Sequence, residues 1–292
     1  MDDRIPAASG TQPMPQKSKG NAMDFFANKT VYITGGSSGI GLAAAHALAQ
    51  RGAHLVLLAR DKKKLDSAAA SLRSSARSSA QKIETFIADV ADAPRAEKAL
   101  AKAVRACGAP DILINSAGAG YFGAFTDTPP EIFQRIFKTN VFGTQGVNHV
   151  LVPVMKEKGG IIVNVSSLGG LIGMYGYSAY GGSKYAVVGM SEAMRAELAP
   201  QGIRVQVLCP PEVDTPMVRE ERASITPEAL AVKLMAGQLT VDQVARVLLR
   251  GIERGSFIII PGFLARSTWV LSRFFPRFSR KVSDLVLKMN RK

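Results

Sequence analysis

Tyr180 and Lys184 could together move a proton, and they lie four residues apart in a stretch that predicts a helix. At this spacing two side chains project from one helical face. A phenol has a pKa of about 10, and an adjacent ammonium group favours the phenolate. Ser167, upstream, could hydrogen-bond the same substrate oxygen. Beside a nicotinamide, these groups suit proton transfer coupled to hydride transfer at a carbonyl or carbinol carbon.

A glycine-rich segment lies far upstream of this pair. It reads Gly35-Gly36-Ser37-Ser38-Gly39-Ile40-Gly41, follows a short β-branched run and opens an alanine-rich helical stretch. Strand, tight turn and helix together aim backbone N–H groups and a helix N-terminus at a phosphate. A tyrosine–lysine pair alone would fit a surface helix, and the glycines alone an ordinary loop. Their joint presence favours a nucleotide site with chemistry beside it.

The alternation of apolar runs and amphipathic stretches predicts an α/β fold. Strands are expected at 30–34, 53–59, 84–88, 111–115, 160–165, 203–208 and 256–260, and helices at 61–80, 94–106, 130–157, 178–199 and 240–253. The strands are apolar throughout, which is typical of a parallel sheet covered on both faces. We therefore expect a single Rossmann-fold domain with a doubly wound parallel sheet of about seven strands.

Ligands of such sheets bind beyond the carboxyl ends of the strands. Where a carboxylate would grip a ribose 2′-hydroxyl, this chain has Ala59 followed by Arg60. A guanidinium can bind a 2′-phosphate bidentately, which predicts NADP(H) over NAD(H). The alternative is that Arg60 merely begins an exposed helix capped by Asp61. Five residues that follow the next two strands are expected to contact the adenine ring and its ribose: Asp89, Val90, Asn115, Ala117 and Gly118.

Composition divides the 292 residues into three parts. Residues 1–28 are polar, without periodicity, and predict a flexible tail. Residues 29–262 form the catalytic domain. Cys107 and Cys209 lack metal-ligand spacing, so we expect reduced thiols in a cytoplasmic setting and no metal site. No secretory signal and no membrane-spanning run is expected.

Residues 263–292 form a basic amphipathic helical extension in which arginines and lysines interleave with aromatic side chains. The net charge of +14 also points to an anionic partner. We expect this segment to lie in an anionic membrane interface, so that the protein is peripheral at a membrane surface. A protein-binding helix and a flap over the chain's own core are the alternatives. No nucleic-acid motif accompanies the charge.

The motifs together resemble the short-chain dehydrogenase/reductase family. They occur in family order from about 29 to 262, and the Ser-to-Tyr spacing selects Ser167 over Ser166. The resemblance implies that Tyr180 is the acid/base and that Lys184 holds the nicotinamide ribose and lowers the tyrosine pKa. It also implies that Ser167 orients the substrate oxygen and that Asn140 holds a proton-relaying water. The implied cofactor contacts are Gly35, Ser37, Ser38, Gly39, Ile40, Gly41, Val213 and Thr215, besides Tyr180 and Lys184.

Two departures from the family pattern are Ser116 for an asparagine and Pro211 for a glycine. The glycine segment 35–41, Ala59-Arg60, Ser178-Ala179-Tyr180 and the segment 210–216 together resemble the 3-ketosphinganine reductases, which implies NADPH-dependent reduction of a long-chain amino ketone. Other lipid, steroid, retinoid or small-ketone reductases stay open, as does a non-catalytic NADPH- and lipid-binding sensor. The resemblance also implies homo-oligomers, dimers or tetramers, through the helices 140–157 and 178–199, with monomers at a lipid surface as the alternative. The expected cleft walls are 119–123, 168–177 and 217–239, which supply Tyr121, Phe122, Leu171, Ile172, Met174, Tyr175, Tyr177, Met217, Leu234 and Met235.

Overall fold

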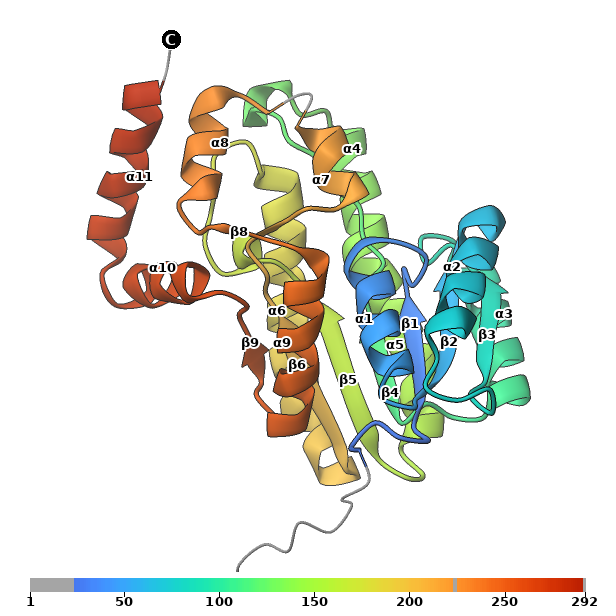
Figure 1. Ribbon diagram of the computed structural model, residues 1–292. Helices are drawn as coiled ribbons and strands as arrows, with labels where there is room; N and C mark the ends of the chain where they lie inside the picture. The colour runs from blue at the N-terminus through green and yellow to red at the C-terminus, as the bar shows by residue number, and fades with distance from the viewer. Residues whose placement is uncertain (1–23, 223–224, 291–292) are drawn as a thin grey trace, which may run out of the picture.

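The computed structural model describes residues 24–222 and 225–290. At its centre is a parallel sheet of seven strands in the order β3-β2-β1-β4-β5-β6-β9 (Figure 1). The strands are β1 Thr30–Thr34, β2 His54–Ala59, β3 Ile83–Ile87, β4 Ile112–Asn115, β5 Gly160–Val165, β6 Ile203–Leu208 and β9 Ile258–Ile259. The strand order reverses between β1 and β4, so the ligand crevice of this fold is expected beyond their carboxyl ends.

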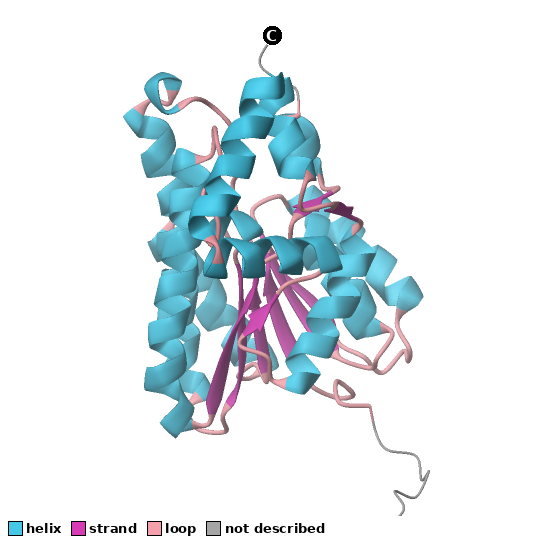
Figure 2. Ribbon diagram, turned by 90° about the vertical axis from the view of Figure 1, so that its left-hand side faces the viewer, coloured by secondary structure: helices cyan, strands magenta, loops and turns pink. Residues whose placement is uncertain are grey.

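Helices cover both faces of the sheet (Figure 2). One face carries α1 Gly39–Ala49, α2 Lys62–Ser75 and α9 Val241–Arg254, and the other carries α3 Ala93–Cys107, α5 Gly143–Met155 and α6 Ser178–Leu198. Successive residues of β1 serve opposite cores: Val31 and Ile33 pack with α1 and α9, while Tyr32 packs with α3 and α5. This period of two explains why the strands are apolar throughout.

The remaining elements gather beyond the carboxyl edge of the sheet. They are α4 Pro130–Phe137, α7 Pro216–Glu221, α8 Pro227–Leu234, the paired short strands β7 Glu212–Val213 and β8 Gln238–Leu239, α10 Phe263–Phe274 and α11 Pro276–Asn290. In Figure 1, α10 leaves the body of the domain and α11 turns back beside α8. In the part of the chain that the structure describes, no helix combines the length and apolarity needed to cross a bilayer.

The predicted α/β fold and its parallel sheet of about seven strands are confirmed, and the structure adds local detail to three predictions. The helices expected near 130–157 are two, Pro130–Phe137 and Gly143–Met155, and a π-helical turn, Lys138–Phe142, joins them. The stretch 217–239 is two short helices and a strand. The predicted tail, of which 1–23 lie outside the described residues, is folded from Asp24 onward. Phe26 is fully buried under the Arg51 guanidinium, which pairs with Asp24 at 2.8 Å.

Candidate active site

The turn between β1 and α1 requires glycine at two positions. Gly35 has φ of +68°, and a Cβ there would lie 2.8 Å from the backbone nitrogen of Ala117. A Cβ on Gly41 would lie 2.5 Å from the carbonyl oxygen of Gly35. Side chains at these positions would push α1 away from the sheet. Gly41 therefore supports the turn from behind, and it does not line the pocket.

The N-terminus of α1 opens into the pocket. Ser37, Ser38, Gly39 and Ile40 line the pocket at this point. Within the described chain, the N-cap residue Ser38 makes no side-chain capping hydrogen bond. The first backbone N–H groups of a helix need an acceptor and carry partial positive charge. The cradle therefore fits a phosphate group, as the glycine pattern predicted.

One pocket of about 550 Å³ runs from this cradle along the carboxyl ends of the strands. It brings together most of the residues predicted from the sequence: Gly35, Ser37, Ser38, Gly39, Ile40, Arg60, Asp89, Val90, Ala117, Gly118, Ser167, Tyr180, Lys184, Val213 and Thr215. Gly41, Asn115 and Asn140 are the predicted residues that do not line it. Pro211, the departure noted above, is also in the lining.

Beyond β2, the pocket is lined by two cations. Arg60 is exposed at its edge, and Lys64 follows one helical turn later. Asp61 caps α2, because its carboxylate accepts a hydrogen bond from the backbone N–H of Lys64 at 3.1 Å. Arg60 is therefore left to face the pocket. Lys64 was missed by the sequence argument, although its spacing from Arg60 places both on one side of the helix start.

Asn115 holds strands together instead of facing the pocket. Its amide donates to the Oδ1 atoms of Asn148 and Asn164, each at 2.9 Å. Asn164 in turn donates to Ser191 Oγ at 2.8 Å. Amide side chains on neighbouring strands and helices thus pair in the core, although the Oδ1 atom of Asn115 has no hydrogen-bond partner among the described residues. The prediction that the Asn115 side chain contacts the cofactor does not fit this orientation.

Asn140 lies in the π-helical turn and is also buried. Its Oδ1 accepts from the backbone N–H of Ala119 at 2.8 Å, while its Nδ2 donates to Ala119 O at 3.0 Å and to Ser183 Oγ at 2.9 Å. The side chain therefore fixes the segment after β4 against α6. Its role in holding a water stays a prediction. Because the side chain makes these contacts, the backbone of the π-helical turn is the part of Asn140 left to hold such a water.

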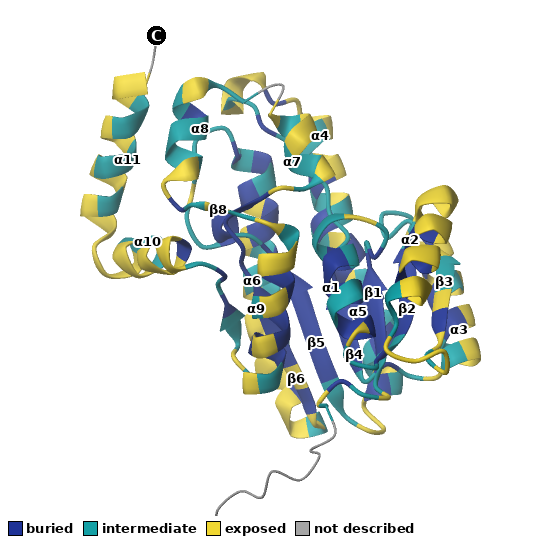
Figure 3. Cartoon of the chain, in the orientation of Figure 1, coloured by how far each residue is buried: buried dark blue, intermediate teal, exposed yellow. Residues whose placement is uncertain are grey.

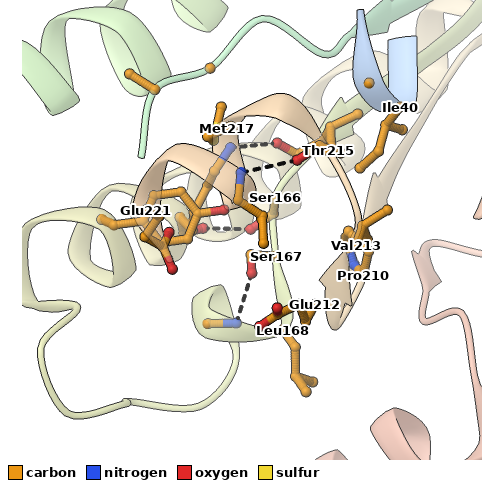
Figure 4. Close-up of a pocket in the computed structure, with 18 of the residues that line it drawn as sticks. Ile40, Ser166, Ser167, Leu168, Pro210, Glu212, Val213, Thr215, Met217 and Glu221 are labelled. Carbon is orange, nitrogen blue, oxygen red and sulfur yellow. Dashed lines mark hydrogen bonds between the residues drawn. The ribbon is translucent and has the colours of Figure 1, made fainter. Parts of the chain in front are cut away.

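Ser167, Tyr180 and Lys184 meet where β5 ends and α6 begins (Figure 4 shows the Ser167 region). Ser167 Oγ accepts from the N–H of Gly169 at 3.1 Å. Lys184 Nζ donates to Val165 O at 3.0 Å and lies 5.6 Å from the centroid of the Tyr180 ring. The three side chains therefore meet at one point in the pocket.

The pKa values of this group depart from the sequence expectation. Burial raises the pKa of Tyr180 to about 12, against the lowering effect of a hydrogen bond with Ser167. Burial lowers the pKa of Lys184 to about 8. Both shifts favour the neutral forms, because charge is costly to bury. The tyrosine pKa is thus raised where the sequence predicted a lowering, because desolvation outweighs the hydrogen bond with Ser167.

Beyond Tyr180 the pocket contains a buried cluster of charged residues. The hydroxyl of Tyr177 donates to Glu221, whose carboxylate also accepts from Lys233. Lys233 lies 3.2 Å from Glu212, which also pairs with Arg222 at 2.6 Å. Figure 4 shows Glu212 and Glu221 on different elements, β7 and α7, facing the same cavity. The sequence argument missed this cluster, because only the fold brings residues 177, 212, 221 and 233 together.

The rest of this end of the pocket is largely apolar. Of the predicted wall residues, the lining includes Ile172, Met174, Tyr177, Met217 and Met235. Tyr121, Phe122, Leu171, Tyr175 and Leu234 are outside the lining, and Phe122 instead supports Tyr177 at 5.4 Å between ring centroids. Residues of α10 and α11 complete the wall: Thr268, Leu271, Ser279, Val282 and Ser283.

Comparison with known sequences places this site in a family. The short chain dehydrogenase profile matches residues 29–226. The chain is 34% identical over 229 residues to a 3-dehydrosphinganine reductase of Danio rerio, covering 78% of this chain and 69% of that protein. It is 31% identical over 274 residues to a 3-ketodihydrosphingosine reductase of Dictyostelium discoideum, covering 89% and 82%.

Solved structures give the same picture. A short chain dehydrogenase/reductase from Burkholderia phymatum in complex with NAD superimposes with a TM-score of 0.76 at 26% identity, covering 87% of this chain and 95% of that chain. L-Sorbose reductase from Gluconobacter frateurii, complexed with NADPH and L-sorbose, gives a TM-score of 0.72 at 26% identity, with coverage of 83% and 99%. The two neighbours thus hold different nicotinamide cofactors.

Proposed function

The chain belongs to the short chain dehydrogenase family and is an oxidoreductase, and from this premise we propose that it reduces 3-ketosphinganine to sphinganine with NADPH. The observation that carries the proposal is the meeting of Ser167, Tyr180 and Lys184 at the point where a phosphate-binding cradle gives way to an apolar pocket. A sensor without turnover would have no use for this arrangement.

The residues present fit a nicotinamide dinucleotide. The N-terminus of α1 would bind the pyrophosphate, and Asp89 and Val90 would border the adenine. Arg60 and Lys64 would bind a 2′-phosphate, and no carboxylate stands at Ala59 to repel one. When bound, the nicotinamide supplies a hydride to the ketone carbon. These two cations are the reason for proposing NADPH over NADH.

The chain's own residues would supply the proton. Ser167 would hold the ketone oxygen, and the Tyr180 hydroxyl would donate its proton to that oxygen as negative charge develops there. Lys184 would stabilise the phenolate that Tyr180 becomes. Because burial keeps Tyr180 protonated at neutral pH, the residue is prepared for reduction rather than for the reverse reaction.

The pocket beyond Tyr180 favours a lipid that carries one amine. Methionine, isoleucine and leucine side chains suit an alkyl chain. Glu221 lies close enough to raise the pKa of Tyr180 by its charge. An ammonium group on the carbon beside the ketone would fall near this carboxylate and offset its charge. A purely apolar ketone would leave the charge cluster unexplained, since burying ion pairs costs free energy.

The C-terminal helices support a membrane location for the reaction. Seven large apolar side chains of this segment are more than half exposed: Phe263, Leu264, Phe274, Phe275, Phe278, Leu285 and Met289. Arg277, Arg280, Lys281 and Lys288 lie between them on α11, against one acidic residue, Asp284. An interfacial helix on anionic lipid has this composition. We propose that α10 and α11 hold the enzyme on an anionic membrane surface.

The test is NADPH oxidation with 3-ketosphinganine in mixed micelles, followed by nicotinamide absorbance. Wild type should turn over, and Tyr180→Phe should lose at least a thousandfold in kcat while still binding NADPH. A ketone of equal chain length without the amine measures the contribution of Glu221. We expect its kcat/KM to be at least tenfold lower.

Each outcome has a distinct meaning. Loss of NADPH binding in Tyr180→Phe would overturn the role given to the phenol. Equal kcat/KM for the two ketones would favour a reductase of another lipid ketone. Absence of turnover by wild type with either ketone would contradict the proposed substrate.

A further inference from the structure

The substrate pocket does not end at the catalytic domain. It is also lined by Thr268 and Leu271 of α10 and by Ser279, Val282 and Ser283 of α11. These residues lie outside the span matched by the family profile, which ends at 226. The sequence argument assigned this segment to an anionic membrane surface, with a protein-binding helix and a flap over the chain's own core as the alternatives. The structure gives it a second surface that faces the substrate.

Helix α11 has two distinct faces. Ser279, Val282, Ser283, Val286 and Leu287 are half-buried and follow a three- and four-residue spacing, so they form one stripe. In Figure 3 the half-buried side of α11 is turned toward α8, on which the helix packs. Phe278, Leu285 and Met289 are instead more than half exposed. The lipid-facing and pocket-facing surfaces of α11 are therefore separate. A residue of one can be changed without altering the other.

Small side chains keep a space open between α8 and α11. Ser279 and Ser283 lie one turn apart on the inner stripe, with Val282 beside them. Leucines at the serine positions would fill this space, as large side chains do in packed cores. The pocket instead continues along Met235 and Ala236, at and just beyond the end of α8, to these three residues. The space is thus a groove continuous with the catalytic pocket.

Helix α10 is anchored to the domain by a buried cluster, in addition to the packing of α11 on α8. Ala265 is fully buried in a cluster with Leu168 and Ala236, and Trp269 packs against the same cluster. Leu168 directly follows Ser167, and both Leu168 and Ala236 line the pocket. The position of α10, and hence of α11, is therefore fixed relative to the catalytic serine. This places the groove at a defined distance from the reacting ketone.

We propose that the groove between α8 and the α10–α11 pair binds the distal part of the substrate's alkyl chain. The inference rests on the proposed function, because it takes the substrate to be a long-chain ketone. Burial of each methylene favours binding by up to about fourfold, so a chain that reaches the groove should gain affinity with length. A chain too short to pass Met235 should gain none.

The kinetic test compares two 2-amino-3-ketones that differ only in chain length, with about 6 and 18 carbons. Val282→Phe fills the groove, and Val286→Phe is the matched control, since Val286 lies on the same stripe but does not line the pocket. We expect Val282→Phe to lower kcat/KM at least tenfold for the long ketone and less than twofold for the short one. Val286→Phe should change both by less than twofold.

A spectroscopic test does not depend on turnover. The chain has a single tryptophan, and this is Trp269, which packs against the lining residues Leu168 and Ala236. A long-chain ketone brominated near its distal end should quench Trp269 fluorescence in wild type, and Val282→Phe should abolish most of this quenching. The measurement also covers the case in which Val282→Phe folds but turns over poorly.

Equal losses of kcat/KM for both chain lengths, or equal effects of the two phenylalanine variants, would contradict the proposed role of the groove. Absence of quenching by the brominated ketone would overturn it as well. These outcomes differ from failure of the proposed function, in which wild type reduces neither ketone. Thermal unfolding of each variant shows whether a loss reflects the groove or the fold.

Discussion

Lys184 is the buried cation of this site. Its Nζ donates to the carbonyl oxygen of Val165, and its side chain is almost fully removed from solvent. Burial lowers its pKa to about 8, so the residue is charged at neutral pH only by a narrow margin. The sequence argument expected the pKa of Tyr180 to move toward neutral pH. In the structure it is the pKa of Lys184 that moves toward neutral pH.

This margin predicts a pH dependence for the reduction. Below pH 8 Lys184 is protonated and stabilises the phenolate, so kcat/KM should be constant there and fall as the pH rises through the lysine pKa. Tyr180, with a pKa of about 12, stays protonated over this range and does not contribute. An anionic cofactor can only raise the lysine pKa, which places the inflection at about pH 8 or above.

A pH profile from 6 to 10 of wild type and Lys184→Met checks this expectation. The variant should be slow at every pH and lack the inflection. An unchanged inflection in Lys184→Met would assign the titration to another group.

Arg60 carries the prediction for cofactor choice. A charge-assisted bidentate contact is worth about 1.5–3 kcal/mol, so Arg60→Ala should weaken NADPH binding at least tenfold. NADH lacks the 2′-phosphate, and its affinity should change less than twofold. Dissociation constants of NADPH and NADH, measured by nicotinamide fluorescence for wild type and Arg60→Ala, test this prediction. Arg105→Ala, an exposed arginine in the last turn of α3, is the control. Equal loss of both cofactors would move the phosphate contact elsewhere.

At the scale of elements, the local sequence pattern was enough to predict the strands of the sheet. The predicted strands 160–165 and 203–208 match β5 and β6 residue for residue, because both are rich in β-branched and apolar residues between turn residues. The helix predicted over 61–80 ends at Ser75 instead. Gln81 explains the difference: its side chain donates to the carbonyl oxygens of Ala49 and Ala53 and holds the following loop on α1. Such a long-range contact has no local signal.

The same reason separates the predicted from the missed parts of the site. The glycine turn and the Tyr180–Lys184 pair were found because each is a local spacing. Asn115 and Asn140 occupy the expected elements, but their side chains point into buried networks that involve distant residues. The pairing of β7 with β8 brings residues 212 and 238 together, and the charge cluster beside Tyr177 depends on it.

At the scale of the whole molecule, the basic residues of α11 predict which part of the protein binds an anionic membrane. Each basic residue near an anionic bilayer contributes about 1 kcal/mol. Replacing Arg277, Arg280 and Lys281 by glutamate should therefore weaken binding to phosphatidylserine vesicles at least a hundredfold. Truncating the segment would be a poorer test, since Ala265 and Trp269 belong to the packed body of the domain.

The matched control has the same change of net charge on another helix. Lys98, Lys102 and Arg105 are exposed along α3 at similar spacing, and their replacement by glutamate should leave most vesicle binding intact. Cosedimentation with vesicles measures both variants. Equal loss in the two would mean that net charge, and not the C-terminal helices, determines the association.

The two ends of the pocket are lined by different elements. The nucleotide end lies between α1 and the carboxyl ends of the strands, and the other end lies at α10 and α11. On the proposed placement of α11 on lipid, one reactant would arrive from water in three dimensions and the other by diffusion within a plane. The quantity that sets the rate for the ketone is then its mole fraction in the bilayer. Diluting the membrane with inert lipid would slow each enzyme molecule even though the amount of ketone per litre stays the same.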